Sequence, residues 1–213
     1  MKLGTLLLGA TALVTLCGTA NAQIALSRHN FASTGWAGGE ICKPCHIPHF
    51  AHPELGYLWN HAISSASYTL FDGSAGTSAD FDRRTRLCLG CHDGTVALDS
   101  FGGTTGTNFI GPAGNVGTDF RDDHPLGKEA VYPTSGTSSR FVVATISTTR
   151  PGTATIGPSG AQLSVREWVD GTGATVYVVA CATCHNVHNS GNRPHMLNLS
   201  NASSALCLTC HIK

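Results

Sequence analysis

The feature that most constrains this chain is a five-residue pattern that occurs four times. Eight of the nine cysteines fall into C-x-x-C pairs, and a histidine directly follows every pair. Cysteines three residues apart lie on one side of a helical turn, so both sulfurs can reach the same bound group. The pattern is referred to below as motifs 1 to 4, which are, in order, Cys42-Lys43-Pro44-Cys45-His46, Cys88-Leu89-Gly90-Cys91-His92, Cys181-Ala182-Thr183-Cys184-His185 and Cys207-Leu208-Thr209-Cys210-His211.

C-x-x-C-H is the attachment sequence of c-type haem, in which the two sulfurs bond the porphyrin vinyl groups and the histidine ligates the iron. Structural disulfides and zinc sites also use C-x-x-C pairs, and an exported chain passes through a compartment where disulfides persist. Neither alternative requires a histidine after every pair. The repetition therefore predicts four covalently bound haem c groups, with four proximal ligands: His46, His92, His185 and His211.

The second axial ligand of each iron decides between electron transfer and substrate chemistry. Apart from the initiator, the chain has one methionine, Met196, so at most one iron has His/Met ligation. Seven histidines lie outside the proximal positions, namely His29, His49, His52, His61, His124, His188 and His195. This supply favours bis-histidine ligation at all four irons, which gives low reduction potentials.

Two of these histidines follow a proximal histidine by three residues. His49 follows His46, and His188 follows His185. Axial imidazoles lie on opposite faces of the porphyrin, and three residues of about 3.5 Å each cannot carry the chain around the disc. If they are ligands, His49 and His188 must bind haems held by other motifs. The alternative is that they hydrogen-bond to propionates.

Three further histidines are candidate distal ligands. His61 follows Trp59, which can cover a porphyrin face, and His124 precedes a proline that favours an extended or turn conformation. His29 lies in an arm before motif 1. The alternatives are a solvated loop histidine for His124 and a free arm histidine for His29. Two histidines are interpreted as non-ligands, His52 and His195.

The start of the chain resembles a secretory signal. Lys2 is followed by a short apolar run and then by Ala20-Asn21-Ala22, a typical cleavage site. We expect removal of residues 1–22, a mature protein that begins at Gln23, and export. A buried N-terminal helix is one alternative. Lipoprotein processing at Cys17 is another, disfavoured by the large leucine before it, and no later stretch is apolar enough to span a membrane.

The composition indicates that the side chains alone form only a thin apolar core, so a bound group is expected to supply much of the buried apolar volume. Charged residues make up 12% of the chain, about half the usual share, and small residues are abundant. The 13 basic and 13 acidic side chains balance, which argues against a nucleic-acid partner. We predict that residues 23–213 form a single tetrahaem domain: mostly irregular coil around a stacked four-haem core, with short helices centred on the motifs.

A small β element is expected in the haem-free segment that spans residues 93–180. This segment contains β-type runs at Arg140–Thr148, Gln162–Val169 and Ala174–Ala180. Asp170-Gly171-Thr172-Gly173 is typical of a hairpin turn and is predicted to join the last two runs.

The residues around the motifs are more specific than the motifs themselves. The chain resembles the OmcE-type tetrahaem cytochromes of bacteria that respire onto external metal oxides and electrodes, over most of its length and in the same order. The phrases that carry this resemblance are Ser27-Arg28-His29, Cys42 to His49, Leu58-Trp59-Asn60-His61, Leu87 to Thr95, Gly117-Thr118-Asp119, Asp122-Asp123-His124-Pro125, Cys184 to Asn189 and Leu206 to His211.

The resemblance implies an extracellular filament in which stacked and T-shaped haem pairs run continuously through polymerised subunits. All irons in such filaments are bis-histidine, and in some of them one ligand comes from the adjacent subunit. Carried over to this chain, the five recurrent histidines are His29, His49, His61, His124 and His188. One of the five is not a ligand, and His29 on its arm is the histidine expected to be donated in trans. The chain departs from the family at His52 and in its long middle segment.

These observations favour an electron carrier with no catalytic residues. The leading hypothesis is a self-polymerising cytochrome at the cell surface or outside it, which exchanges electrons with redox partner cytochromes and extracellular acceptors. The alternatives are a monomeric periplasmic tetrahaem shuttle and a multihaem reductase. A reductase needs an iron with an open or unusual axial position, whereas all four motifs end in histidine and distal histidines are in surplus.

Overall fold

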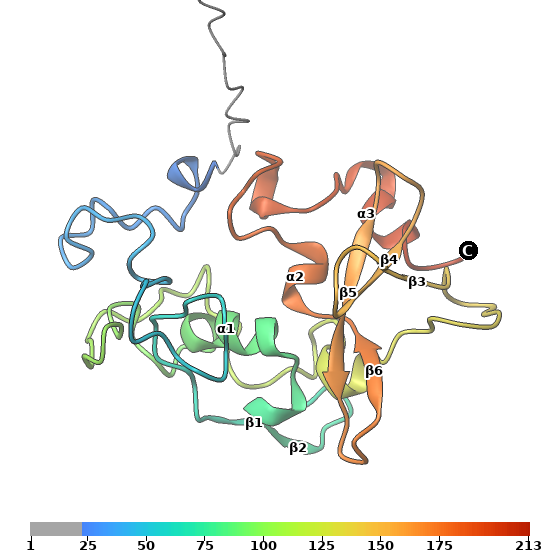
Figure 1. Cartoon of the computed structure of the whole chain (residues 1–213), viewed down its shortest axis with the longest axis horizontal. Helices are drawn as coiled ribbons and strands as arrows, with labels where there is room; N and C mark the ends of the chain where they lie inside the picture. Colours follow the sequence, from blue (N-terminus) through green and yellow to red (C-terminus); the bar gives the residue numbers. More distant parts are fainter. Residues whose placement is uncertain (1–22) are drawn as a thin grey trace, which may run out of the picture.

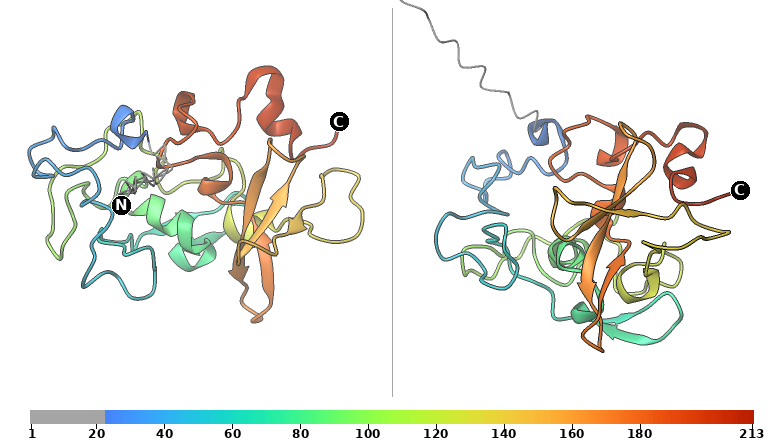
Figure 2. Two further views of the ribbon diagram at one scale, coloured as in Figure 1. Left: turned by 45° about the horizontal axis from the view of Figure 1, so that its top comes forward. Right: turned by 45° about the vertical axis from the view of Figure 1, so that its right-hand side comes forward.

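A computed structural model describes residues 23–213, so the expected signal at residues 1–22 lies outside the described part. Figures 1 and 2 show helices α1 and α2 near the centre, with a β-sheet on one side and the N-terminal segment on the other. The α-helices are α1 (Arg83–His92), α2 (Cys181–Cys184) and α3 (Ala205–Leu208). The 3₁₀ turns are η1 (Ile24–Leu26), η2 (Ser78–Asp80), η3 (Gly127–Ala130), η4 (Pro194–Met196) and η5 (Ala202–Ser204).

Three of the four motifs lie on α-helices, as predicted. Motif 2 forms the end of α1, motif 3 begins α2, and α3 begins just before motif 4. Helix α1 starts after Asp82, whose carboxylate accepts hydrogen bonds from the amides of Arg84 and Thr85. An aspartate in this position satisfies amides that have no partner within the helix.

The prediction of a helix at motif 1 is wrong. Residues 42–46 form a turn, although the His46 amide donates to the Cys42 carbonyl over 2.8 Å, the bond expected of one helical turn. Pro44 has no amide hydrogen and disfavours helical geometry at Lys43 before it, so the turn does not extend into a helix.

The predicted β element is a four-stranded antiparallel meander. Its strands are β3 (Thr145–Ile146), β4 (Thr153–Ile156), β5 (Leu163–Val169) and β6 (Thr175–Val178), in that order across the sheet. The predicted hairpin is confirmed, because β5 pairs with β6 and Asp170 Oδ1 accepts from the amides of Thr172 and Ala174 in the turn. The first predicted run contributes only the two residues of β3, and the sequence did not predict β4.

A two-stranded hairpin between motifs 1 and 2 was not predicted either. It pairs β1 (Ser67–Thr69) with β2 (Ala75–Thr77) and lies near the β5–β6 hairpin of the larger sheet (Figure 1). Apolar side chains of the described residues gather in three small clusters, one of them beside the sheet. The clusters are Tyr132, Ala144, Ala154, Ile156, Val165 and Val179; Tyr68, Leu70, Phe81, Leu89 and Phe120; and Leu55, Trp59 and Leu87.

Polar contacts join the central helices to the sheet. The amide of Cys181 at the start of α2 donates to Thr85 Oγ1 of α1, and Thr183 Oγ1 of α2 donates to the Ser164 carbonyl of β5. These contacts place motifs 2 and 3 side by side at the centre of the molecule. Within residues 23–213, no helix is both long and apolar enough to cross a bilayer.

Candidate functional site

All four motifs fold their first cysteine and their histidine into the same local geometry. The histidine amide donates to the carbonyl of the first cysteine in motif 1, motif 3 and motif 4, over 2.8, 3.0 and 2.9 Å. In motif 2 the same residues lie within α1. All eight cysteines of the described residues are free, so the structure gives no disulfide among them.

Backbone carbonyls orient the proximal imidazoles. The Nδ1 atoms of three proximal histidines each lie within hydrogen-bonding distance of a carbonyl oxygen. The pairs are His46 with Tyr57 (2.7 Å), His92 with Gly114 (2.6 Å) and His185 with His195 (2.9 Å). An imidazole that donates from Nδ1 has its Nε2 lone pair available for a metal, and this second contact fixes the ring orientation.

Three of the proximal histidines face a second histidine ring. The ring centroids are 6.2 Å apart for His46 and His188, 5.9 Å for His29 and His92, and 6.3 Å for His124 and His211. Two imidazoles that share one metal through bonds of about 2 Å have ring centres about 6 Å apart. The spacing of these pairs therefore fits an iron between the two rings at motifs 1, 2 and 4.

The surroundings of two distal candidates favour the neutral form of the imidazole, which is the form that binds a metal. The pKa of His29 is lowered by burial and then by the nearby His92, and the pKa of His188 is lowered by burial and then by His46. Only a neutral imidazole offers a lone pair to a metal, so both shifts favour the state that binds iron. His124 adds the same carbonyl contact as the proximal rings, with Nδ1 at 2.8 Å from the Pro125 carbonyl.

The two remaining distal candidates differ from these three. His49 is exposed. His61 is buried, with Nδ1 at 2.7 Å from the Ala62 carbonyl and Nε2 at 3.0 Å from the Ala97 carbonyl. Both nitrogens of His61 thus face backbone oxygens rather than an open metal position. Within residues 23–213, the ring of His185 pairs with no other histidine ring in the way that the other proximal rings do.

Two histidines, His52 and His195, are predicted from the sequence to be non-ligands, and the two have different surroundings in the structure. The backbone of His195 supplies the carbonyl that orients His185, a contact for which the sequence holds no signal. His52 is half-buried, and its Nδ1 has no hydrogen-bond partner among the described residues. Neither residue forms a ring pair with a proximal histidine.

Cysteines of successive motifs are close enough to affect one another's pKa. Burial raises the pKa of Cys91 to about 12 and that of Cys184 to about 11, and in each case a sulfur of a neighbouring motif adds to the rise. These influences on the pKa link Cys45 with Cys91, Cys88 with Cys181 and Cys184 with Cys210, so each motif is near the next one in the chain.

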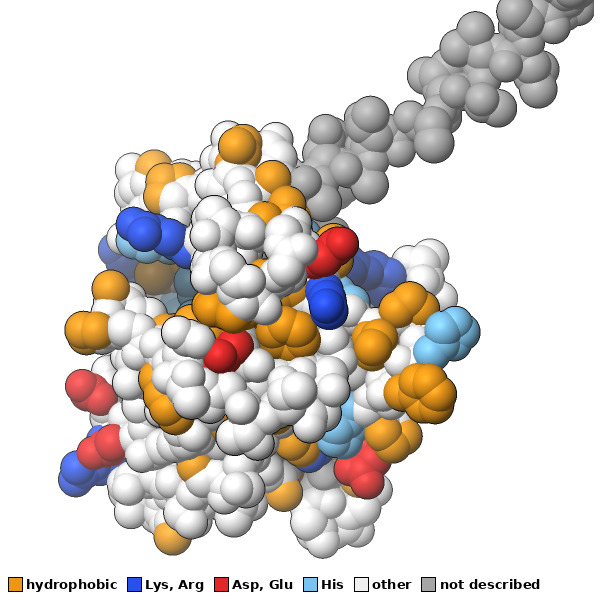
Figure 3. Space-filling view, turned by 90° about the vertical axis from the view of Figure 1, so that its left-hand side faces the viewer, with side chains coloured by type: hydrophobic (Ala, Val, Ile, Leu, Met, Phe, Trp, Pro, Cys, Tyr) orange, Lys and Arg blue, Asp and Glu red, His pale blue; other side chains and the backbone are white. Residues whose placement is uncertain are grey.

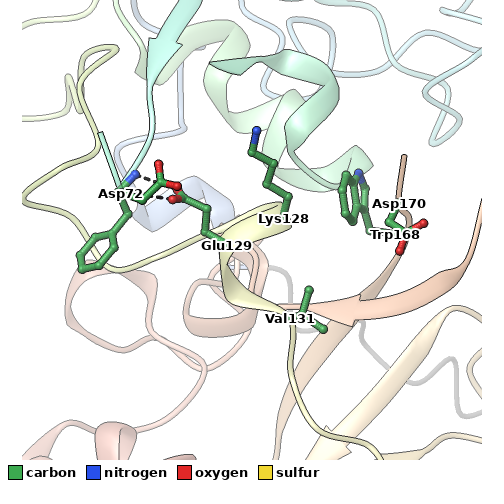
Figure 4. Close-up of a pocket in the computed structure, with 7 residues that line it drawn as sticks. Asp72, Lys128, Glu129, Val131, Trp168 and Asp170 are labelled. Carbon is green, nitrogen blue, oxygen red and sulfur yellow. Dashed lines mark hydrogen bonds between the residues drawn. The ribbon is translucent and has the colours of Figure 1, made fainter. Parts of the chain in front are cut away.

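A surface pocket lies apart from these groups (Figure 4). It is bordered by Phe71, Asp72, Lys128, Glu129, Val131, Trp168 and Asp170, none of which belongs to a motif. Within residues 23–213, no group of three or more histidine, cysteine and acidic side chains is arranged to hold a metal ion. A zinc site needs such a group, so the zinc interpretation has no geometric support in this part of the chain.

Comparison with known proteins supports the haem interpretation for part of the chain. Residues 175–213, which contain motifs 3 and 4, match the family model described as the doubled CXXCH motif. No curated protein and no solved structure matches the chain. The chain thus carries the motif of multihaem c-type cytochromes, which indicates covalently bound haem c and electron transfer.

Proposed function

We propose that this protein binds four haem c groups and conducts electrons as the subunit of an extracellular cytochrome filament. The observation that carries the proposal is the pairing of three proximal histidine rings with a second histidine ring, at spacings that fit an iron. When bound, haem c supplies reversible one-electron Fe(III)/Fe(II) chemistry. Electrons enter from a redox partner cytochrome and leave to an extracellular acceptor.

In this proposal the chain holds each group in place and closes its iron to substrates. His46 and His188, the latter from the loop after motif 3, would hold the iron at motif 1, His92 and His29 would hold the iron at motif 2, and His211 and His124 would hold the iron at motif 4. Each distal histidine thus ties together two segments that are distant in sequence. Such crosslinks keep the spacing between neighbouring groups constant, which repeated electron transfer requires.

The fourth iron, at His185, is proposed to receive its distal ligand from a second copy of the chain. His49 is exposed, pairs with no proximal ring among the described residues, and adjoins Phe50, whose side chain is fully exposed. The exposed Leu58 is close to this segment, because the Ile47 amide donates to the Leu58 carbonyl over 2.8 Å. Figure 3 shows histidines together with apolar side chains on one face of the molecule. A second copy that covers Phe50 and Leu58 would bury these apolar side chains and receive His49.

This assignment replaces the expectation that His29 is the ligand donated in trans. His29 is half-buried, and its ring centroid lies 5.9 Å from that of His92 in the same chain. A histidine held in this way is placed to serve its own subunit. The exposed His49 is the better donor to a neighbour.

Electron microscopy of material sheared from expressing cells, with the haem content measured beside it, tests the filament. Thin haem-containing filaments, with four haems per subunit, would support the proposal. Dispersed particles of monomer size, with the haem-stained protein retained in the periplasm, would contradict the filament and leave a soluble electron shuttle.

A multihaem reductase is the second candidate, and the unpaired ring of His185 is the observation that favours it. A reductase would keep an open iron at motif 3 in every assembly state, and small anions such as cyanide would bind there. In a filament with a ligand donated in trans, all four haems are low-spin and cyanide has no open position. Electron paramagnetic resonance of monomer and filament, with and without cyanide, separates the two.

A further inference from the structure

We propose that a buried charge pair, Asp82 and Arg166, sets the reduction potentials of the haems at motifs 2 and 3 relative to those at motifs 1 and 4. The inference rests on the proposed function only in that motifs 2 and 3 must carry haem. It does not depend on the filament.

Each residue of the pair belongs to an element that adjoins one of the two central attachment sites. Asp82 precedes α1, which carries motif 2, and Arg166 lies on β5, which packs against α2 of motif 3. The amide of Cys181 donates to Thr85 Oγ1, and the Thr85 hydroxyl donates to Asp82 Oδ2. Asp82 therefore has a continuous hydrogen-bonded connection to the first cysteine of motif 3.

Both charged side chains are withdrawn from solvent. The exposed fraction is 1% for Asp82 and 8% for Arg166. Burial raises the pKa of Asp82, and burial followed by nearby arginines lowers the pKa of Arg166 to about 10. Arginine stays protonated at neutral pH even so, and three accepted hydrogen bonds favour the ionised form of Asp82.

Arg166 has few partners for a buried guanidinium. Its Nη1 donates to Thr153 Oγ1 over 3.0 Å, and its Nε has no partner among the described residues. The salt bridges found in residues 23–213 include none between Arg166 and Asp82, although the two charges stabilise each other through space. An arginine so placed serves mainly as a fixed positive charge, because most of its donors make no side-chain hydrogen bond.

A fixed charge in a poorly solvated region acts on nearby groups over a longer range than one at the surface. A positive charge stabilises the reduced iron and raises the potential, whereas a negative charge stabilises the oxidised iron and lowers it. Removal of the Arg166 charge should therefore lower the potentials of the two central haems. Removal of the Asp82 charge should raise them.

The test compares Arg166→Gln and Asp82→Asn in the full-length holoprotein by spectroelectrochemical titration. Asparagine also caps helices, so Asp82→Asn keeps the start of α1. We expect two of the four midpoint potentials to fall in Arg166→Gln and the same two to rise in Asp82→Asn. Arg166→Lys keeps the charge and should restore the original values. Arg121→Gln removes an exposed arginine and should change none of them.

Two kinds of failure are distinguishable. In a protein that still carries four haems, three outcomes would contradict the proposed role of the charge pair. These are unchanged potentials, equal shifts of all four potentials, and shifts in the same direction in both variants. A wild-type protein without haem at motif 2 or motif 3, shown by mass spectrometry of haem-peptides, would instead contradict the proposed function.

Discussion

The rings of His46 and His188 lie 6.2 Å apart, with their planes inclined by 22°. One ring belongs to motif 1, and the other comes from the loop after motif 3. An iron bound by both rings would crosslink the C-terminal part of the chain to its N-terminal part. The structure thus offers a direct way to ask whether distal ligands come from distant motifs.

Replacement of His188 with alanine should convert one of four haems from low-spin to high-spin, because the iron at motif 1 loses its second imidazole. Optical and electron paramagnetic resonance spectra of the purified monomer measure the change. The control is His195→Asn, since asparagine tolerates the positive φ of 54° at this position. A four-haem spectrum that is the same for His188→Ala and wild type would contradict the assignment.

The sequence predicted the local features of the site better than its long-range contacts. The turn at Asp170–Gly173 was predictable, because the chemistry that closes it lies within the turn itself. The partner of each proximal histidine was not predictable, because a ring pair such as His124 and His211 joins separate segments and leaves no spacing rule. Strand β4 was missed because Thr153–Ile156 is short and takes its place from pairing with β5.

The helix at motif 1 was predicted by analogy between motifs, and the difference has a local cause. Motif 1 has Pro44 where the other motifs have residues with an amide hydrogen, and no helical segment precedes it. Motif 2 lies at the end of a ten-residue helix, α1, and Asp82 caps the start of that helix. The C-x-x-C-H pattern therefore specifies one turn, and the flanking residues decide whether that turn becomes a helix.

Replacement of Gly90 with alanine should destabilise the protein by about 1–3 kcal/mol, as overpacking of a filled site does. A Cβ atom at Gly90 would lie 2.7 Å from the Ala62 carbonyl and 3.6 Å from His61 Nδ1. Urea unfolding followed by circular dichroism gives the free energy. Gly111→Ala is the matched control, because a Cβ there meets no atom within 4 Å. Equal stability of the two variants would refute the predicted clash.

Replacement of Tyr132 with phenylalanine should lower the free energy of unfolding by about 1 kcal/mol, the usual net value of an internal hydrogen bond. The Tyr132 hydroxyl donates to the carbonyls of Val142 (2.8 Å) and Cys210 (3.2 Å), which links the sheet region to motif 4. Chemical unfolding measures the change. The control is Tyr177→Phe, because the Tyr177 hydroxyl makes no hydrogen bond in residues 23–213. A loss as large in the control would show that the hydrogen bond is not the cause.

Replacement of His49 with alanine should leave the spectrum of the purified monomer unchanged and abolish filaments. The His49 ring pairs with no proximal histidine ring among residues 23–213, so its removal should affect no iron of its own subunit, whereas a neighbour would lose the ligand that serves the iron at His185. Microscopy and spectra of monomer and sheared material, compared with His188→Ala, measure both effects. A high-spin haem already present in the His49→Ala monomer, but absent from the wild-type monomer, would mean that His49 acts within its own chain. Normal filaments with four low-spin haems in His49→Ala would require another histidine as the ligand at motif 3.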